Sequence, residues 1–139
     1  MSLIAIAPYI TRDEYACRCC GKLPPDFHDH RYPLAHSMLF EAFEIIREAY
    51  GEPIYISSGY RCPSHNKLIG GKPLSAHVFG LALDLQTGTA TELVYQIIQR
   101  EVPDLRVGKY NWGLHMDMAY LINPRASESW EKGVRWNGY

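Results

Sequence analysis

The sequence lacks any apolar run that approaches the roughly 20 residues needed to span a bilayer. It also lacks runs of like charge, and its formal net charge is −1, so nothing steers the protein broadly toward nucleic acid or an anionic membrane. Residues Met1 to Tyr9 contain no basic segment, and their apolar run is too short for a signal peptide. We therefore expect a protein that is synthesised in the cytoplasm, spans no membrane and does not bind nucleic acid.

Internal repeats, linkers and low-complexity segments are missing as well. What is present is an ordinary globular balance, with 47% hydrophobic and 21% charged residues in a chain of 139. This length suits one domain with a modest core and no disulfide scaffold. We expect a single domain over 1–139 and a monomer.

Apolar periodicity predicts an α+β fold, in which helices pack on a small antiparallel sheet. Apolar residues at three- and four-residue spacing from Met38 to Ala49 predict a helix closed by Gly51. A second helix is expected over Thr91 to Arg100, with its cap at Thr89 or Thr91, and a short one near Pro63. The first 33 and last 20 residues read as irregular. Short strands are predicted at 54–58, 81–85, 106–108 and 114–118.

Asp84 is the first candidate for chemistry, because it interrupts an otherwise apolar strand. On a strand its side chain shares a face with the small Ala82. A buried carboxylate needs a partner, and a divalent cation is one. His77 can reach the same point if Gly80 lets the chain turn back tightly. The alternatives are a buried ion pair between Asp84 and Arg61, and a capping or loop role for His77.

The strand at 114–118 carries His115 and Asp117 on one face. If this strand pairs beside 81–85, His115 and Asp84 can meet across the sheet. Two histidines and one carboxylate leave an open coordination position, which is typical of a catalytic rather than a structural zinc site.

These residues resemble a known family. Ser75-x-His77-x-x-Gly80-x-Ala82-x-Asp84 is similar to the signature of zinc D-Ala-D-Ala carboxypeptidases and of phage L-alanyl-D-glutamate endopeptidases, whose fold Hedgehog signalling domains share. The resemblance runs from about residue 10 to about residue 125. Further matching segments are Glu14-Tyr15-x-Cys17-x-Cys19-Cys20-Gly21, Ser58-Gly59-Tyr60-Arg61-Cys62-Pro63-x-x-Asn66 and Gly113-Leu114-His115-Met116-Asp117.

The resemblance implies one zinc ion held by His77, Asp84 and His115, with water as the fourth ligand. It implies that Arg61 binds the substrate at a carbonyl or carboxylate. Ser75 is expected to bind substrate or to hydrogen-bond to a metal ligand, and the alternative for Ser75 is that it caps a turn. The expected activity is hydrolysis of D-amino-acid-containing peptide bonds in peptidoglycan, with zinc lowering the pKa of a water to about 7. With no standard signal peptide, a phage or prophage protein that reaches the cell wall by another route is expected.

The general base departs from the family pattern. Many members carry Glu three residues before the last zinc histidine, where this chain has Trp112, and others carry His two residues before it, where it has Gly113. Asp117 is the remaining candidate base, although it could instead orient His115 or pair with Arg61. His36 and His65 are weaker candidates. Without a base, the alternative function is a non-catalytic zinc-containing module that binds cell-wall peptide or forms part of a phage particle. Hydrolysis of a free dipeptide is a third hypothesis.

The four cysteines, at 17, 19, 20 and 62, leave three interpretations open. They could be small thiols that pack a loop, or a disulfide could join Cys62 to the N-terminal group. Cys17-x-x-Cys20 also has the spacing of a zinc knuckle. A second zinc needs further ligands, and the sequence has no other C-x-x-C pair.

Overall fold

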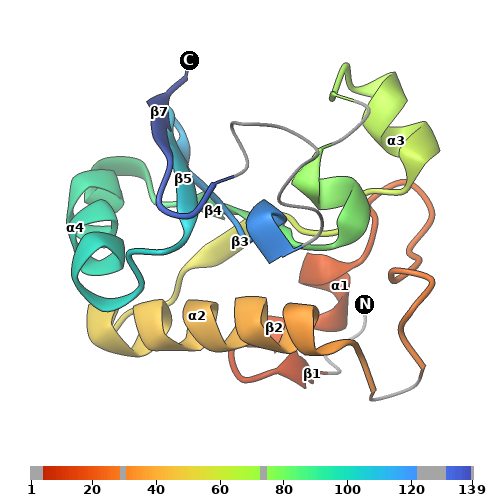
Figure 1. Ribbon diagram of the computed structural model, residues 1–139, viewed down its shortest axis with the longest axis horizontal. Coiled ribbons are helices and arrows are strands. Elements are labelled where there is room, and N and C mark those ends of the chain that lie inside the picture. The colour runs from red at the N-terminus through yellow and green to blue at the C-terminus, as the bar shows by residue number, and fades with distance from the viewer. Residues whose placement is uncertain (1–4, 29–30, 73–74, 122–130, 139) are drawn as a thin grey trace.

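The computed structural model describes residues 5–28, 31–72, 75–121 and 131–138. Two sheets and four α-helices make up most of this part of the chain (Figure 1). The α-helices are α1 (Arg12–Tyr15), α2 (Leu34–Tyr50), α3 (Pro63–Leu68) and α4 (Thr91–Glu101), with 3-10 turns η1 (Ala76–Phe79), η2 (Gly88–Ala90) and η3 (Ala119–Leu121). The strands are β1 (Ala5–Ala7), β2 (Ile10–Thr11), β3 (Tyr55–Ser58), β4 (Ala82–Gln86), β5 (Arg106–Lys109), β6 (Gly113–Asp117) and β7 (Arg135–Asn137).

The main sheet has the order β3-β4-β6-β5-β7. Its first three pairings are antiparallel, as predicted, but β7 runs parallel to β5, so the sheet is mixed. The last 20 residues are therefore not wholly irregular, although 122–130 lie outside the described residues. β7 could not be predicted from the sequence, because its three residues are too few to show an alternation of buried and exposed side chains. The α+β class and four strands near their predicted places are confirmed.

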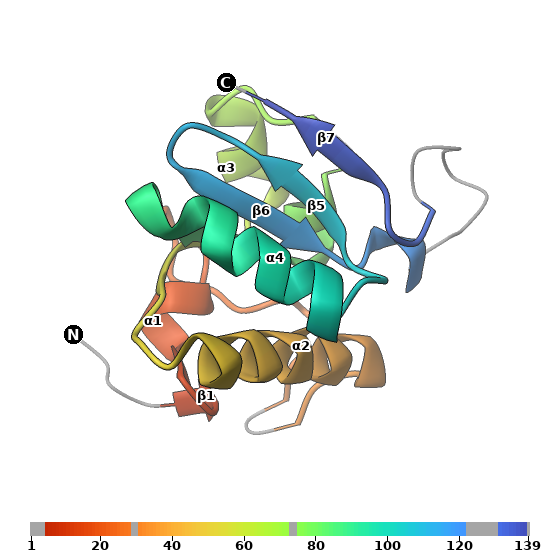
Figure 2. The same cartoon turned by 90° about the vertical axis from the view of Figure 1, so that its left-hand side faces the viewer.

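Helices α2 and α4 pack together and lie on one face of the sheet (Figure 2). Burial on this face stabilises the domain, because apolar area removed from water contributes about 25 cal/mol per Å². The predicted helix faces need small corrections, since Met38, Ile45 and Leu93 are partly or mostly exposed. The residues that α2, α4 and the sheet bury together include Leu39, Phe43, Ile46, Leu83, Leu85, Val94, Ile98, Leu114 and Met116.

Both helices end close to where the sequence indicates. Gly51 adopts the left-handed conformation with φ 81°, and it caps α2. Helix α4 ends at Glu101, two residues before Pro103. Its predicted side-chain cap is wrong, because the N-cap position is Ala90 and makes no side-chain hydrogen bond. The hydroxyl of Thr91 donates instead to the Gly88 carbonyl within the preceding turn.

The segment before α2 is more ordered than its sequence predicts. β1 and β2 form a small antiparallel pair, and α1 follows at once with a capping box between Thr11 and Glu14. Tyr15 ends α1, and its ring is fully buried. Its carbonyl accepts a hydrogen bond from the Tyr60 N–H at 2.7 Å, which joins this segment to the chain just after β3.

Candidate metal centre

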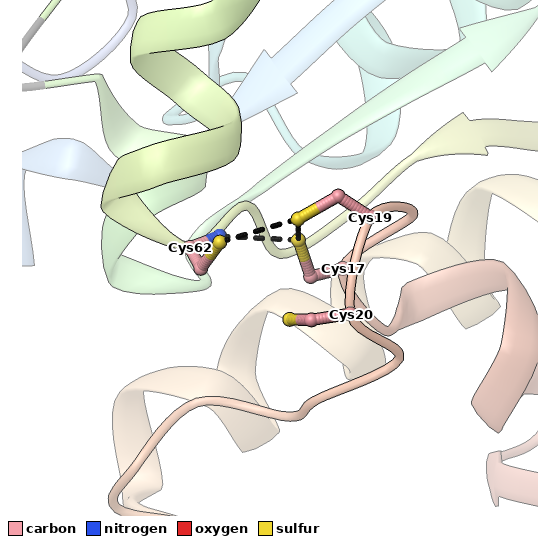
Figure 3. Close-up of side chains that lie close together, drawn as sticks. All are labelled: Cys17, Cys19, Cys20 and Cys62. Carbon is pink, nitrogen blue, oxygen red and sulfur yellow. Dashed lines mark hydrogen bonds between the residues drawn. The ribbon is translucent and has the colours of Figure 1, made fainter.

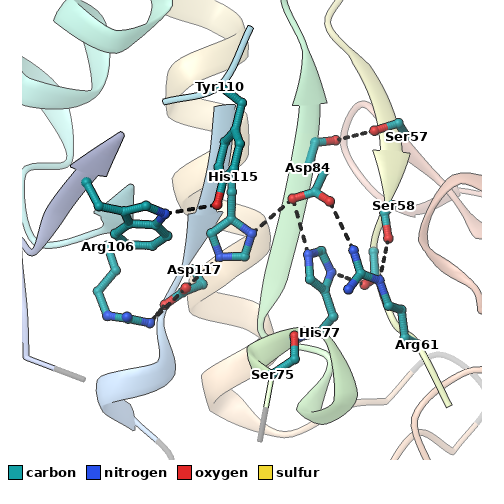
Figure 4. A network of polar contacts seen from close by, with 12 residues as sticks. Ser57, Ser58, Arg61, Ser75, His77, Asp84, Arg106, Tyr110, His115 and Asp117 are labelled. Carbon is teal, nitrogen blue, oxygen red and sulfur yellow. Dashed lines mark hydrogen bonds and ion pairs between the residues drawn. The ribbon is translucent and has the colours of Figure 1, made fainter. Parts of the chain in front are cut away.

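The second face of the sheet carries polar groups on β4 and β6. Asp84 and His115 are direct partners in the register of the two strands, as predicted, and Asp117 pairs with Ala82. Alternation places the apolar residues of the same strands on the helix-covered face. Small residues surround the polar ones, because Ala76, Ala82 and Ala119 form a separate buried cluster. The sheet therefore presents a carboxylate and an imidazole side by side (Figure 4).

His77 reaches this face from η1, the turn that precedes β4. Gly80 ends the turn with φ 74°, a conformation that L side chains rarely adopt. A Cβ there would lie 2.5 Å from the Tyr15 hydroxyl oxygen, so glycine is required by space as well as by conformation. Tyr15 donates its hydroxyl proton to the Gly80 carbonyl at 2.6 Å. The tight turn expected from the sequence is thus present.

Side-chain atoms of His77, Asp84 and His115 lie within 4.8 Å of one another, in a group that could hold a metal ion. His77 Nε2 lies 3.2 Å from Asp84 Oδ1, and His115 Nδ1 lies 3.0 Å from the same oxygen. The His77 side chain is 2% exposed and that of Asp84 is 11% exposed. The His115 side chain, at 15%, is more open.

On each imidazole, the nitrogen that faces away from Asp84 has a hydrogen-bond acceptor beside it, and this acceptor fixes the position of the ring proton. His77 Nδ1 lies 2.6 Å from the Gly59 carbonyl, which can only accept, so Nδ1 carries the proton. His115 Nε2 lies 2.6 Å from Asp117 Oδ2, an acceptor too. The neutral His77 ring then turns the lone pair of Nε2 toward Asp84 Oδ1, and the His115 ring does the same from Nδ1 once that nitrogen has lost its proton. Three acceptors facing one another need a proton or a cation between them, and this donor set is one that zinc takes.

The pKa shifts agree with this arrangement. Burial lowers the pKa of His77 below its ordinary value. Burial acts on His115 in the same direction, but hydrogen bonds to Asp117 and Asp84 outweigh it and raise the pKa to about 9. Burial raises the pKa of Asp84, yet His77 and His115 outweigh that effect and hold it well below its ordinary range. Positive charge is therefore stabilised at this point.

Arg61 contacts the other oxygen of Asp84, with Nη2 donating to Oδ2 at 3.2 Å. This is the ion pair considered above, and it coexists with the imidazole contacts. The guanidinium also donates from Nε to Ser58 Oγ at 3.2 Å and from Nη1 to Asn66 Oδ1 at 3.4 Å. Three of its five N–H bonds are thus used among the described residues, and its side chain is 16% exposed.

Asp117 is almost inaccessible, with a relative exposure of 1%. Besides His115, it accepts from Arg106 Nη1 at 2.9 Å on both oxygens and from the Ala119 N–H at 3.0 Å. Burial raises the pKa of Asp117, but His115 and Arg106 outweigh burial and lower it below its ordinary value. Its charged partner is Arg106 rather than Arg61. Of the roles considered for Asp117, these contacts favour orientation of His115.

The other predicted residues lie at the margin of the group. Ser75 Oγ accepts from the His77 N–H at 3.2 Å, which is the turn-capping role. His36 Nε2 lies 2.9 Å from the Phe79 carbonyl. Neither His36 nor His65 belongs to the group of converging ligand atoms, which contains only His77, Asp84 and His115. Substrate binding by Ser75 and a general-base role for His36 or His65 remain predictions.

Sequence reasoning missed two neighbours of this group. Arg106 is the register partner of Asp117 on β5, so opposite charges on adjacent predicted strands were the available signal. Trp136 on β7 lies with its ring centroid 5.6 Å from that of His115. Its indole N–H donates to the Tyr110 hydroxyl at 3.0 Å. No periodic pattern marks this tryptophan in the sequence.

The fold and geometry therefore define a candidate metal site of two histidines and one carboxylate on one face of an α+β sheet. The chain belongs to the peptidase M15 family, whose model matches residues 8–117. No curated protein sequence matches the chain significantly. Peptidases of this family are zinc-dependent and have the Hedgehog and D-Ala-D-Ala peptidase type of fold. The predicted family and fold are confirmed. Among the described residues, no helix is long and apolar enough to cross a membrane.

Proposed function

We propose that this chain is a zinc peptidase that hydrolyses D-amino-acid-containing peptide bonds of peptidoglycan. One observation carries the proposal: two imidazole nitrogens and a carboxylate oxygen lie within 4.8 Å of one another in an M15 family member. His77 Nε2, His115 Nδ1 and Asp84 Oδ1 would hold the ion. Bound there, zinc would supply Lewis-acid polarisation of a carbonyl and activation of a water. The substrate class follows from the family resemblance of the motifs.

The protein groups around the ligands divide the remaining work. The Gly59 carbonyl holds the proton of His77 on Nδ1, and Asp117 holds that of His115 on Nε2. Both contacts keep the opposite nitrogens free as ligands. Arg106 neutralises Asp117 and keeps it ionised in a buried position. These groups position the ligands and need not touch the substrate.

Arg61 is proposed to bind the substrate while it still holds Asp84. Its two remaining N–H bonds can donate to a scissile carbonyl or a terminal carboxylate, for which a planar guanidinium is well suited. The side chains of Arg61 and His115 are the most exposed of the four central ones. Substrate would therefore approach from the side on which these two residues lie, between β3 and β6.

A second candidate function has its own supporting observation. Trp112 and Gly113 occupy the positions of the usual bases, and Asp117 has both carboxylate oxygens engaged by His115, Arg106 and Ala119. A protein with zinc and Arg61 but no proton acceptor would bind a cell-wall peptide without cleaving it. The candidate site is the same in both cases, so only turnover separates them.

The test uses zinc-loaded protein on purified peptidoglycan and on a synthetic stem pentapeptide that ends in D-Ala-D-Ala. Released amines and product masses are measured for the wild type and for His77→Ala, with the exposed His28→Ala as a matched control. The peptidase proposal predicts cleavage by the wild type and by His28→Ala, and none by His77→Ala. The product masses identify the bond. Zinc retention and peptide binding without any product would replace the peptidase with the binding module.

A further inference from the structure

A second group of metal-ligating side chains lies away from the sheet face. The sulfur atoms of Cys17, Cys19, Cys20 and Cys62 all lie within 4.8 Å of one another (Figure 3). The first three follow α1, and Cys62 lies between β3 and α3. All four are described, and all are free thiols. We propose that these four cysteines bind a structural zinc ion, in addition to the ion at the histidines.

Two of the six sulfur–sulfur distances are close to those of tetrahedral coordination, and the other four are below 4.8 Å. With zinc–sulfur bonds of about 2.3 Å, ligand sulfurs are about 3.8 Å apart at the edges of the tetrahedron. Cys19 Sγ lies 3.5 Å from Cys17 Sγ and 3.5 Å from Cys62 Sγ. A set of four sulfurs is complete, so no second C-x-x-C pair and no histidine is needed. Cys62 supplies the ligand that the sequence could not assign.

Backbone N–H groups point at the sulfurs, as thiolate ligands require. The Cys62 N–H donates to Cys17 Sγ at 3.3 Å, and the His65 N–H donates to Cys62 Sγ at 3.4 Å. The Cys19 N–H also donates to Cys17. Such charge-assisted hydrogen bonds stabilise a thiolate over a thiol. The cluster is therefore arranged to hold negative sulfur.

The close approach of the sulfurs shifts the pKa values of Cys17 and Cys19 in opposite directions. Burial raises the pKa of Cys17, but N–H donation from Cys62 and Cys19 outweighs burial and lowers it to about 6. Hydrogen bonds with Cys62 and Cys17 raise the pKa of Cys19 to about 12. Without a metal the sulfurs thus share protons, because adjacent thiolates repel. A divalent ion removes that repulsion and releases the protons.

The two other interpretations of the cysteines fit the structure less well. Cys19 and Cys20 are exposed, so their sulfurs do not fill a core. A single disulfide would join only two of the four sulfurs and would leave the other two without a reason to converge. A tetrahedral ion accounts for all four positions at once.

The position of the four cysteines, next to the histidine site, indicates a structural role for the ion. Cys62 follows Arg61 directly. Gly59, three residues before Cys62, provides the carbonyl that accepts a hydrogen bond from His77 Nδ1. The Arg61 N–H donates to the His77 carbonyl at 3.0 Å. An ion that binds Cys62 to the segment after α1 would fix this wall of the histidine site. It would act as a staple in a region that has little sheet or long helix to support it.

The experiment measures zinc per chain after purification under reducing conditions, for the wild type, His77→Ala and Cys20→Ala. Cys20 is exposed, so its removal leaves the core intact, and the exposed Ser64→Ala serves as a neighbouring control. We expect two zinc ions in the wild type and in Ser64→Ala, and one in His77→Ala. Cys20→Ala should lose its second ion to a chelator at least tenfold faster than the wild type does.

Cobalt substitution assigns the retained ion to sulfur. The cobalt form of His77→Ala should show the intense sulfur-to-cobalt charge-transfer absorption of a thiolate site. A His77→Ala protein that binds neither zinc nor cobalt, or that contains a disulfide by mass, would overturn the proposal. This result is distinct from failure of the peptidase proposal, in which His77→Ala keeps its sulfur-bound ion but the wild type cleaves nothing.

Discussion

The two candidate metal sites are built in opposite ways. The histidine site rests on β4 and β6, where the register places Asp84 beside His115, and its donors are mostly buried. The cysteine site is assembled from two irregular segments far apart in sequence, and two of its sulfurs are exposed. The sheet can hold its site in place without a metal, whereas the loops have little else to hold theirs. We therefore expect the first ion to serve chemistry and the second to serve stability.

Among the variants that distinguish the histidine site from the cysteine site, we expect the largest effect when a ligand is removed from the histidine site. His77→Ala removes one of three donors, so we expect loss of that zinc and of peptide hydrolysis to background. The fold should persist, because the sheet does not depend on the ion. Circular dichroism and thermal unfolding, compared with His28→Ala, check the second part. A variant that unfolds would mean that the sheet site is structural as well.

Gly80→Ala tests how the turn before β4 delivers His77. The left-handed conformation and the clash with Tyr15 together should destabilise the protein by about 2–4 kcal/mol. Gly51→Ala is the matched control, since it has φ 81° but nothing within 4 Å of the added Cβ. It should cost about 1 kcal/mol, from conformation alone. Urea unfolding measures both, and equal losses would remove the steric part of the argument.

The experiment that separates positioning from proton transfer is Asp117→Asn. If Asp117 orients His115, the amide should weaken zinc binding about 10–100-fold, because it breaks the charged contacts to His115 and Arg106. Activity at saturating zinc should then recover substantially. The exposed Asp104→Asn is the control. Unchanged zinc affinity with activity abolished would instead assign Asp117 as the general base.

Thr11→Ala should have the smallest effect. It removes the capping box of α1, which normally costs about 1 kcal/mol. Because α1 leads into the cysteine segment, we expect a slightly lower unfolding temperature and unchanged zinc at the histidines. Loss of the histidine-bound zinc in this variant would show that the two sites are more tightly coupled than the contacts indicate.

The sequence was informative where periodicity governs position. Alternation in 81–85 and 114–118 placed Asp84 and His115 on one face, and the structure pairs them. Opposite charges on the predicted strands at 106–108 and 114–118 hinted that Arg106 neutralises Asp117, but the register that pairs them is set by the tertiary fold. A link between Cys62 and the N-terminal cysteines stayed one of three open interpretations, since loops carry no repeating pattern that would place them. The parallel strand β7 was missed because it is too short to alternate.

Zinc at His77, Asp84 and His115 is tested most directly by an anomalous difference map at the zinc edge, from crystals of the wild type grown with zinc. We predict a peak about 2.0–2.2 Å from His77 Nε2, His115 Nδ1 and Asp84 Oδ1, with Asp117 still bound to His115 Nε2. If zinc-rich crystals show no peak between these three atoms, and the imidazoles instead donate protons to Asp84, then this group is not a zinc site.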